Sequence, residues 1–364
     1  MALRHLVWVP AKLFGTHRTT LRLPIPPPIR AALSGDEHLA AMAEIRGRLE
    51  RLGFQLGEEL KLNPNRGRVI VRCGPDGEYI AKLYLRSIYA PLRHLNRPEE
   101  EIKAHMELAN STAFRMIPRG ISSDEFGIVM ERVSGLSLPE YVLRNSDCAI
   151  EICEKVIERY LVFSQEPSAA FGHIDVRRLA SAEVHELWRV AFQTDATLSR
   201  LLAHKLAAER HIERECWKAI ERLSACVNSS DSSLTPVFAS RDLFVQNIMV
   251  AETDPIVIDW DHAGATFLEF EIATYVASVV ALFLQAGRIG AAQEFISLSM
   301  NRLWQAENIN GEVFAKALSV YFAAMQINPT LWDYSDVNCP QLNSFAQTCS
   351  VVRRLREFSE VVLL

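Results

Sequence analysis

The segment FASRDLFVQNIMV, residues 238–250, interrupts an apolar, strand-like run with two polar side chains, Asp242 and Asn247. Shortly after it, PIVIDWDHAG at 255–264 has the same layout, because an apolar run leads directly into Asp259. Acids and amides at strand ends are common turn formers, so one Asp-x4-Asn spacing alone is structural more often than catalytic. Two neighbouring runs that both present such groups at their ends predict a functional site.

The bulk composition is that of an ordinary globular protein. Its 364 residues exceed the usual size of a single domain, which predicts one large domain or two lobes that share a cleft. The net charge of -5 gives no reason to expect a nucleic-acid partner, which would favour a clustered basic surface. No apolar run approaches the ~20 residues of a membrane span, and Pro10 and Lys12 interrupt the short apolar stretch near the N-terminus. We therefore expect neither a membrane contact nor a signal peptide.

The seven cysteines are widely spaced, odd in number and without a CxxC pair. Zinc sites and disulfide frameworks typically place cysteines in pairs at short, regular spacings. The pattern argues against both and favours a reducing compartment, so we expect a cytoplasmic protein.

Changes in sequence texture predict three regions. Residues 1–53 form an N-terminal extension, in which a proline-rich arm precedes a helix at 34–53 that starts with a Ser/Asp cap signal and ends at a glycine. Residues 54–133 are β-rich, with a hairpin whose turn contains Pro75-Asp76-Gly77. Residues 134–364 are mostly helical and carry the two polar segments quoted above.

Within these regions the pattern predicts the following elements. A helix is expected at 98–110, with a proline near its start and acids in its first turn. Strand-like runs follow at 114–122 and 126–133. Long helices are expected at 138–165 and 181–227.

Five polar residues in these elements could together perform phosphoryl transfer. Asn247 and Asp259 offer oxygen ligands of the kind that Mg²⁺ prefers. Lys82, at the end of an apolar strand, can meet nucleotide phosphates as a point charge, with Glu101 on the next helix to hold it. Asp242 remains free to orient a hydroxyl nucleophile. Positioning and charge neutralisation supply most of the catalysis in that reaction.

These motifs resemble the protein-kinase-like superfamily, specifically its aminoglycoside phosphotransferase and choline kinase branch of small-molecule kinases. The loop of that family reads H-G-D-x-x-x-x-N, followed by strands and I-D-W/F-x-x-A-G, and this chain has SRDLFVQNIMV and VIDWDHAG. The resemblance implies an α+β, bilobal fold with a small β-rich N-lobe and a larger helical C-lobe. It implies Asp242 as the catalytic base, Asn247 and Asp259 as magnesium ligands, Lys82 as the phosphate-contacting lysine and Glu101 as its partner.

The same resemblance covers residues 55–280 and includes a hinge. IVMERVSGLSL at 128–138 is similar to the segment whose backbone meets adenine, which implies that Glu131 and Val133 face the nucleotide base. The implied cofactors are ATP and Mg²⁺, although the sequence does not separate ATP from GTP.

Three features depart from the family pattern. Ser240 stands where the family has a histidine that hydrogen-bonds within the loop, and Arg241 replaces the small glycine of this branch. The phosphate-covering loop near 60–71 contains only one glycine, Gly67. The first departure affects the rigidity of the loop more than its chemistry.

Two neighbours of the metal turn have open roles. Asp261 is a candidate auxiliary metal residue, and His262 is either a proton shuttle or, as is more common, a hydrogen-bonding neighbour. The acceptor substrate is expected against the helical insert at about 165–230, whose mixed charges do not identify it.

The sequence therefore predicts an ATP-dependent phosphotransferase that phosphorylates a hydroxyl group of a small molecule, such as an aminoglycoside. The alternative is a pseudokinase-like module that binds a nucleotide or a partner without turnover, and transfer of a nucleotidyl group is a third hypothesis. A monomer and a homodimer are both compatible with the sequence.

Overall fold

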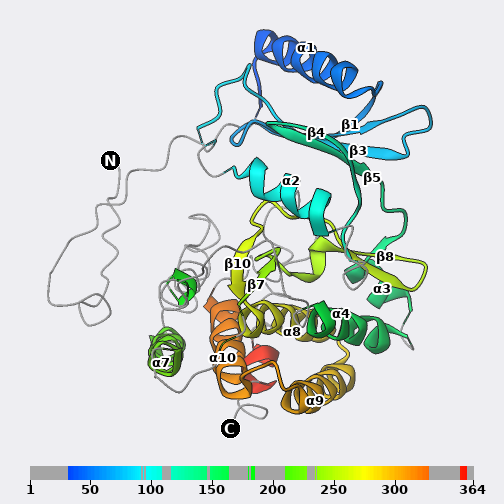
Figure 1. The fold of residues 1–364 in the computed structure, drawn as a ribbon. Helices are drawn as coiled ribbons and strands as arrows, with labels where there is room; N and C mark the ends of the chain where they lie inside the picture. Colours follow the sequence, from blue (N-terminus) through cyan, green and yellow to red (C-terminus); the bar gives the residue numbers. More distant parts are fainter. Residues whose placement is uncertain are drawn as a thin grey trace, which may run out of the picture.

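The computed structural model describes residues 32–91, 93, 96–108, 116–145, 148–163, 179, 182–184, 210–227, 234, 236–327 and 353–358. These residues form a β-rich lobe above a helical lobe (Figure 1). The prediction of an α+β bilobal fold is therefore confirmed. The proline-rich arm of the N-terminal extension lies outside the described residues.

The N-lobe is built on a five-stranded antiparallel sheet with the strand order β1-β2-β3-β5-β4. Its strands are β1 (Leu56–Asn63), β2 (Arg68–Cys73), β3 (Tyr79–Tyr84), β4 (Gly120–Asp124) and β5 (Gly127–Glu131). Successive side chains of a strand point to opposite faces. Ala81 and Leu83 join the apolar core on one face, so Lys82 and Tyr84 point to the other. Arg68 pairs in register with Tyr84 and shares that second face.

Helix α1 (Gly35–Leu52) covers the apolar face of this sheet (Figure 1). Ser34 and Glu37 form a capping box at its start, and Gly53 ends it in the left-handed conformation, as the sequence predicted. Ile45 and Leu49 are fully buried against the strands. Helix α2 (Pro98–Glu107) lies on the opposite side of the sheet, between the two lobes.

Two predicted boundaries were wrong in this part of the chain. The helix expected at 138–165 is two helices, α3 (Leu138–Arg144) and α4 (Ala149–Phe163). Asn145 ends the first, with a non-helical backbone and its side-chain amide donating to the Tyr141 carbonyl. The strand expected from residue 114 begins only at Gly120, because Met116 and Ile117 are buried in the core of the C-lobe.

The C-lobe packs helices around one large apolar core. Its remaining elements are β6 (Leu136–Ser137), α7 (Arg210–Val227), β7 (Pro236–Ala239), the short 3₁₀ helix η4 (Val245–Asn247), β8 (Ile248–Ala251), β9 (Asp254–Val257), β10 (Gly264–Phe267), α8 (Leu268–Gln285), α9 (Ile289–Gln305) and α10 (Gly311–Ile327). Strands β6, β8 and β9 form one small sheet, and β7 pairs with β10 in another. Only the end of the long helix expected at 181–227 is described as an extended helix, α7.

The two opening sequence segments were predicted as strands that hold Asp242 and Asn247. Strands do form on either side, as β7 and β8, but Asp242 lies in the loop between them and Asn247 ends η4. The polar residues interrupt the ladder because their side chains bond within the loop, as described below.

Helix α8 is the nearest approach to a membrane-spanning segment in the part of the chain that the structure describes. By length and composition it could cross a bilayer, although no apolar run of that length was expected from the sequence. Nearly all of it is buried inside the C-lobe, where it packs against α9 and α10. An apolar central helix of this kind is what a large helical core requires.

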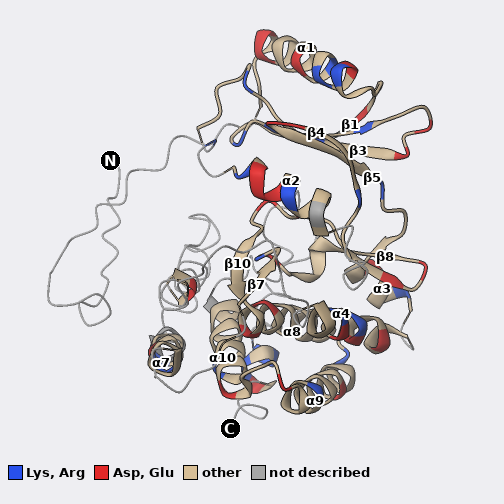
Figure 2. Cartoon of the chain, viewed as in Figure 1, with Lys and Arg blue, Asp and Glu red and all other residues tan. Residues whose placement is uncertain are grey.

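The surface charge and the cysteines do not indicate a particular binding partner or cofactor. Acidic and basic residues are interspersed along α1 and α4 (Figure 2). The described cysteines, Cys73, Cys148, Cys153, Cys216 and Cys226, are free thiols.

Candidate active site

The loop between β7 and β8 folds back on itself through its polar residues. The side-chain amide of Asn247 donates to both the backbone oxygen and the carboxylate Oδ2 of Asp242, each at 2.9 Å. Phe244 N–H donates to the Asp242 carbonyl at 2.8 Å, and Asn247 N–H donates to the Phe244 carbonyl at 2.9 Å. These bonds fix the two candidate residues against each other.

Asp259 follows β9 and is tied to the same loop. Ile258 N–H donates to the Asn247 carbonyl at 2.9 Å, and β8 pairs with β9 in register just before it. The hairpin therefore brings the ends of the two sequence segments together, as their common layout predicted.

Lys82 reaches this hairpin from the N-lobe. Its Nζ lies 2.5 Å from Glu101 Oε1 on α2 and 2.8 Å from Asp259 Oδ1. Tyr84, two residues along the same strand face, donates from its hydroxyl to Glu101 Oε2 at 2.6 Å. Lys82 and Glu101 are almost completely buried. The sequence-predicted residues Lys82, Glu101 and Asp259 are thus in direct contact.

Asp261 is more central than the sequence suggested. Its Oδ1 pairs with Lys82, while its Oδ2 pairs with Arg66 and with Arg68. Asp261 is only 4% exposed. Three cations of the N-lobe therefore meet one carboxylate of the C-lobe. The two arginines flank Gly67 in the glycine-poor loop. Only the glycines of this loop were considered in the sequence, and the positive charge of Arg66 and Arg68 is the feature that could have indicated their role.

The local charges set the protonation of the two candidate aspartates. Burial raises the pKa of Asp242 to about 6, and the nearby charge of Asp259 adds to this. Burial would also raise the pKa of Asp259, but the charges of Lys82 and Arg68 outweigh it and hold that pKa well below the ordinary value. Asp259 is therefore ionised at any ordinary pH. The pKa of Asp242, by contrast, lies close enough to neutral pH for this residue to accept and release a proton as a general base.

Ser240 and Arg241 are anchored to a buried acid on α8, Glu271. Ser240 Oγ donates to Glu271 Oε1 at 2.8 Å, and Arg241 N–H donates to the same oxygen at 3.2 Å. Tyr160 donates to it from its hydroxyl at 3.4 Å. Arg241 has a positive φ of 58°, the conformation that favours the glycine typical of this position. Its guanidinium bonds Glu183 at 2.9 Å.

The residues that pair around Lys82 and Asp261 form an ionic cluster, which consists of Arg66, Arg68, Lys82, Glu101, Asp259 and Asp261. The two hinge residues make no described contact with it. Glu131 ends β5, and its exposed carboxylate pairs with Arg119 at 3.2 Å. Val133 lies in the connection to β6 and is half-buried. His262 is close enough to Asp259 for its charge to help lower the pKa of that aspartate.

The described residues contain one acidic group compact enough to suggest a cation, formed by Glu101, Asp259 and Asp261. The ammonium of Lys82 contacts all three. Arg66 and Arg68 add two further cations at Asp261. The oxygens left for a metal are Asp259 Oδ2 and the side-chain oxygen of Asn247.

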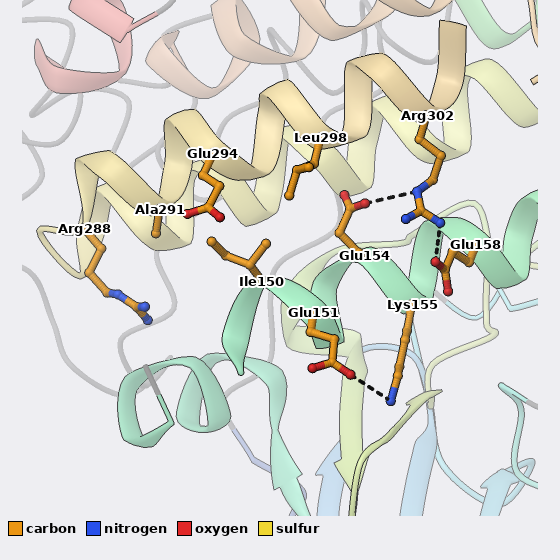
Figure 3. Close-up of a pocket in the computed structure, with 10 residues that line it drawn as sticks. All are labelled: Ile150, Glu151, Glu154, Lys155, Glu158, Arg288, Ala291, Glu294, Leu298 and Arg302. Atoms are coloured by element: carbon orange, nitrogen blue, oxygen red, sulfur yellow. Dashed lines mark hydrogen bonds and ion pairs between the residues drawn. The ribbon is translucent and has the colours of Figure 1, made fainter. Parts of the chain in front are cut away.

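A separate hollow of about 670 Å³ lies between α4 and α9 (Figure 3). Most of its charged residues pair with one another: Arg302 contacts Glu154 and Glu158, and Lys155 contacts Glu151. None of the residues of the ionic cluster lines it.

A loop with aspartate and asparagine, a following aspartate and a lysine–glutamate pair between two lobes define the class of kinase-like phosphotransferases. The phosphotransferase enzyme family matches residues 65–295, more than half of the chain, and the chain belongs to that family. It is therefore a phosphotransferase, a kinase that acts on hydroxyl groups.

The chain is also similar to solved structures of other kinases. Aminoglycoside phosphotransferase APH(4)-Ia gives a TM-score of 0.52 at 10% identity, covering 88% of this chain and 99% of that one. A thermostable mutant of it, in a ternary complex with ADP and hygromycin B, gives 0.49 at 11% identity, covering 87% and 97%. Choline kinase LicA from Streptococcus pneumoniae gives 0.48 at 12% identity, covering 88% and 99%. No curated protein sequence matches the chain significantly.

Proposed function

We propose that this protein transfers the γ-phosphoryl group of ATP to a hydroxyl of a small molecule. The observation that carries the proposal is the contact of Lys82, held by Glu101, with Asp259 across the two lobes, beside the bonded pair Asp242 and Asn247. A nucleotide phosphate chain placed there would have the Lys82 ammonium on one side and Asp242, the proposed general base, on the other.

Asp242 is the residue that we assign to the acceptor hydroxyl. Its Oδ2 accepts from Asn247, which leaves Oδ1 for the substrate. With a pKa of about 6 it is mostly ionised at neutral pH and able to accept the hydroxyl proton as the oxygen attacks. Lys82 neutralises charge on the phosphates, and Glu101 with Tyr84 holds the lysine in place.

The donor set fits Mg²⁺. Asn247 uses its amide nitrogen on Asp242, so its oxygen is left as a ligand, and Asp259 uses only Oδ1 on Lys82. A carboxylate and an amide oxygen are hard ligands, and this cation usually takes one or two protein groups besides phosphates and water. When bound, it would supply charge neutralisation and alignment to the phosphates.

The decisive experiment incubates the purified protein with radiolabelled ATP, Mg²⁺ and a panel of acceptors. Aminoglycosides come first, then choline, ethanolamine, amino alcohols and sugars. We expect transfer to at least one acceptor, and its loss in Asp242→Asn and Asp259→Ala. Full activity of Asp259→Ala would contradict the assignment of the metal ligands.

Calorimetry of ATP binding with and without Mg²⁺ accompanies the screen. Binding of Mg·ATP that is lost in Asp259→Ala supports the proposed site. Binding without transfer to any acceptor would instead favour the pseudokinase-like module, which neither the family nor the retained site residues support.

A further inference from the structure

The turn between β1 and β2 lies where a kinase-like fold covers the nucleotide phosphates, yet two of its backbone N–H groups are already bonded within the turn. Asn63 Oδ1 accepts the backbone N–H groups of Asn65 and Arg66, at 3.1 and 3.2 Å. Phosphate-binding loops commonly cradle their ligand with such N–H groups. Here a side chain of the turn already satisfies them, so the positive groups that remain are the side chains of Arg66 and Arg68.

The same turn is held rigidly in position. Asn96 Nδ2 donates to the Arg66 carbonyl at 2.8 Å, and Leu85 N–H donates to the Gly67 carbonyl at 2.6 Å. Gly67 has a φ of 63°, and a Cβ there would lie 3.0 Å from the Ala90 side chain. Arg66 therefore starts from a fixed backbone, which reduces the entropy lost when it binds a ligand.

Both arginines converge with Lys82 on Asp261. Arg66 Nη1 lies 3.1 Å from Asp261 Oδ2, and Arg68 pairs with the same oxygen. Arg68 is 7% exposed, and its Nη1 forms this ion pair without a hydrogen bond to any described group. One buried and one half-buried guanidinium group and an ammonium on one carboxylate mark a position built for an anion, and Lys82 is the group already assigned to phosphate.

We propose that Arg66 and Arg68 bind the phosphates of the nucleotide, and that Asp261 is their partner when no nucleotide is present. This rests on the proposed function and adds to it two binding residues and an exchange. Guanidinium groups suit phosphate oxygens because they offer planar, paired donors. Phosphates entering the site take over the arginine donors from Asp261, so the carboxylate competes with the nucleotide.

The test is calorimetry of ADP and of adenosine, both in EDTA so that no metal contributes. Adenosine shares the base and sugar but has no phosphate, so the ratio of the two affinities isolates the phosphate contacts. We expect Arg66→Ala and Arg68→Gln to weaken ADP at least about tenfold, which is about 1.4 kcal/mol, and to leave adenosine unchanged.

Matched controls exist in the same lobe. Arg86 is an exposed arginine that pairs with Glu125, and Arg48 is a buried one that pairs with Asp124 on the far face of the sheet. Arg86→Ala and Arg48→Gln should retain the wild-type affinity ratio. Retained adenosine binding shows that each variant is folded. If Arg68→Gln does not fold, Arg66→Ala alone still tests the proposal, because Arg66 is only half-buried.

Asp261→Asn tests the exchange. Removing the competing charge should tighten ADP in EDTA by about threefold or more. Weaker ADP binding in Asp261→Asn would overturn the inference. It would also be overturned if the two arginine variants bound ADP as tightly as their controls. A wild-type protein that binds neither ADP nor adenosine, with Mg²⁺ as well as in EDTA, would refute the proposed function instead.

Discussion

Glu271 anchors the loop at Ser240, the position at which the family motif has a larger histidine. Its Oε1 accepts from Ser240, from the Arg241 backbone and from Tyr160. The family motif places a histidine where this chain has Ser240, and the shorter serine reaches only because an acid on α8 lies 2.8 Å away. The sequence indicated the departure at Ser240 but not its compensation, since Glu271 is 31 residues further along the chain.

Ser240→Ala should therefore reduce turnover as well as stability. Loss of the hydroxyl removes one donor to Glu271 and should cost about 1–2 kcal/mol, and a displaced loop should slow transfer about tenfold or more. Ser299 is a matched control: it is equally buried and donates to Glu154 at 2.9 Å on the other side of the C-lobe. Ser299→Ala should lose similar stability in urea and keep the wild-type kcat. Equal loss of kcat in both variants would contradict the role of Ser240.

Glu271 also predicts a pH dependence of stability. Burial raises its pKa from 4.5 to about 7, against the hydrogen bonds from Ser240 and Arg241 that lower it. Between about pH 4.5 and 7 the folded state holds a proton that the unfolded state has released, so stability falls as pH rises through this window. The full effect is about 3 kcal/mol, at 1.36 kcal/mol for each pKa unit.

Glu271→Gln should remove this dependence while keeping an oxygen that can accept from Ser240. Urea unfolding of both proteins at pH 5 and pH 7.5 measures it. The variant should gain stability relative to the wild type as pH rises. Parallel curves would mean that Glu271 is ionised in the folded protein throughout.

At the scale of elements, the turn Pro75-Asp76-Gly77 between two strand-like runs was the most informative signal in the sequence. It placed Lys82 at the end of a strand in a hairpin, and the register adds Arg68 and Tyr84 to the same face. The backbone conformation of Arg241 and the helix break at Asn145 were less predictable, because each depends on local hydrogen bonds to specific partners. The hinge roles of Glu131 and Val133 stay predictions.

The connection from β5 to β6 yields a prediction at this scale. Gly135 has a φ of 154°, and a Cβ there would lie 2.1 Å from the carbonyl oxygen of Val250, in the strand that pairs with β6. Gly135→Ala must displace that strand and should destabilise the protein by about 1–3 kcal/mol or more. Gly290, in α9, has open space at its Cβ position, and Gly290→Ala should be neutral or stabilising by up to about 1 kcal/mol. Thermal unfolding compares the two, and a Gly135→Ala variant as stable as the wild type would contradict the packing.

At the scale of the whole molecule, each lobe has its own apolar core, and both charged groups and the apolar face of α2 connect them, because Ala104 of α2 belongs to the larger core. Arg66, Arg68 and Lys82 of the N-lobe meet Asp259 and Asp261 of the C-lobe. These contacts join residues that are 177 to 195 positions apart, so no local pattern could predict them. The motif could predict Lys82 and Asp259 because a family shares them, whereas the arginine pair could be recognised only after the chain was folded.

This division predicts that the lobes unfold separately. The N-lobe core is much the smaller of the two, and a molecule with two cores need not unfold in one step. Residues 32–133 contain no tryptophan, while Trp260 is fully buried in the C-lobe. On heating, we expect circular dichroism to change before tryptophan emission does.

A nucleotide bound between the lobes should bring the two transitions together. A ligand at one hundred times its Kd adds about 2.7 kcal/mol to the state that binds it, and unfolding of the N-lobe alone would forfeit this energy because Lys82 lies in that lobe. Saturating Mg·ADP should therefore raise the first transition toward the second in the wild type and have little effect in Asp259→Ala. Coincident transitions without nucleotide would contradict the independence of the lobes. A raised first transition in Asp259→Ala equal to that in the wild type would show that Asp259 does not couple the bound nucleotide to the C-lobe.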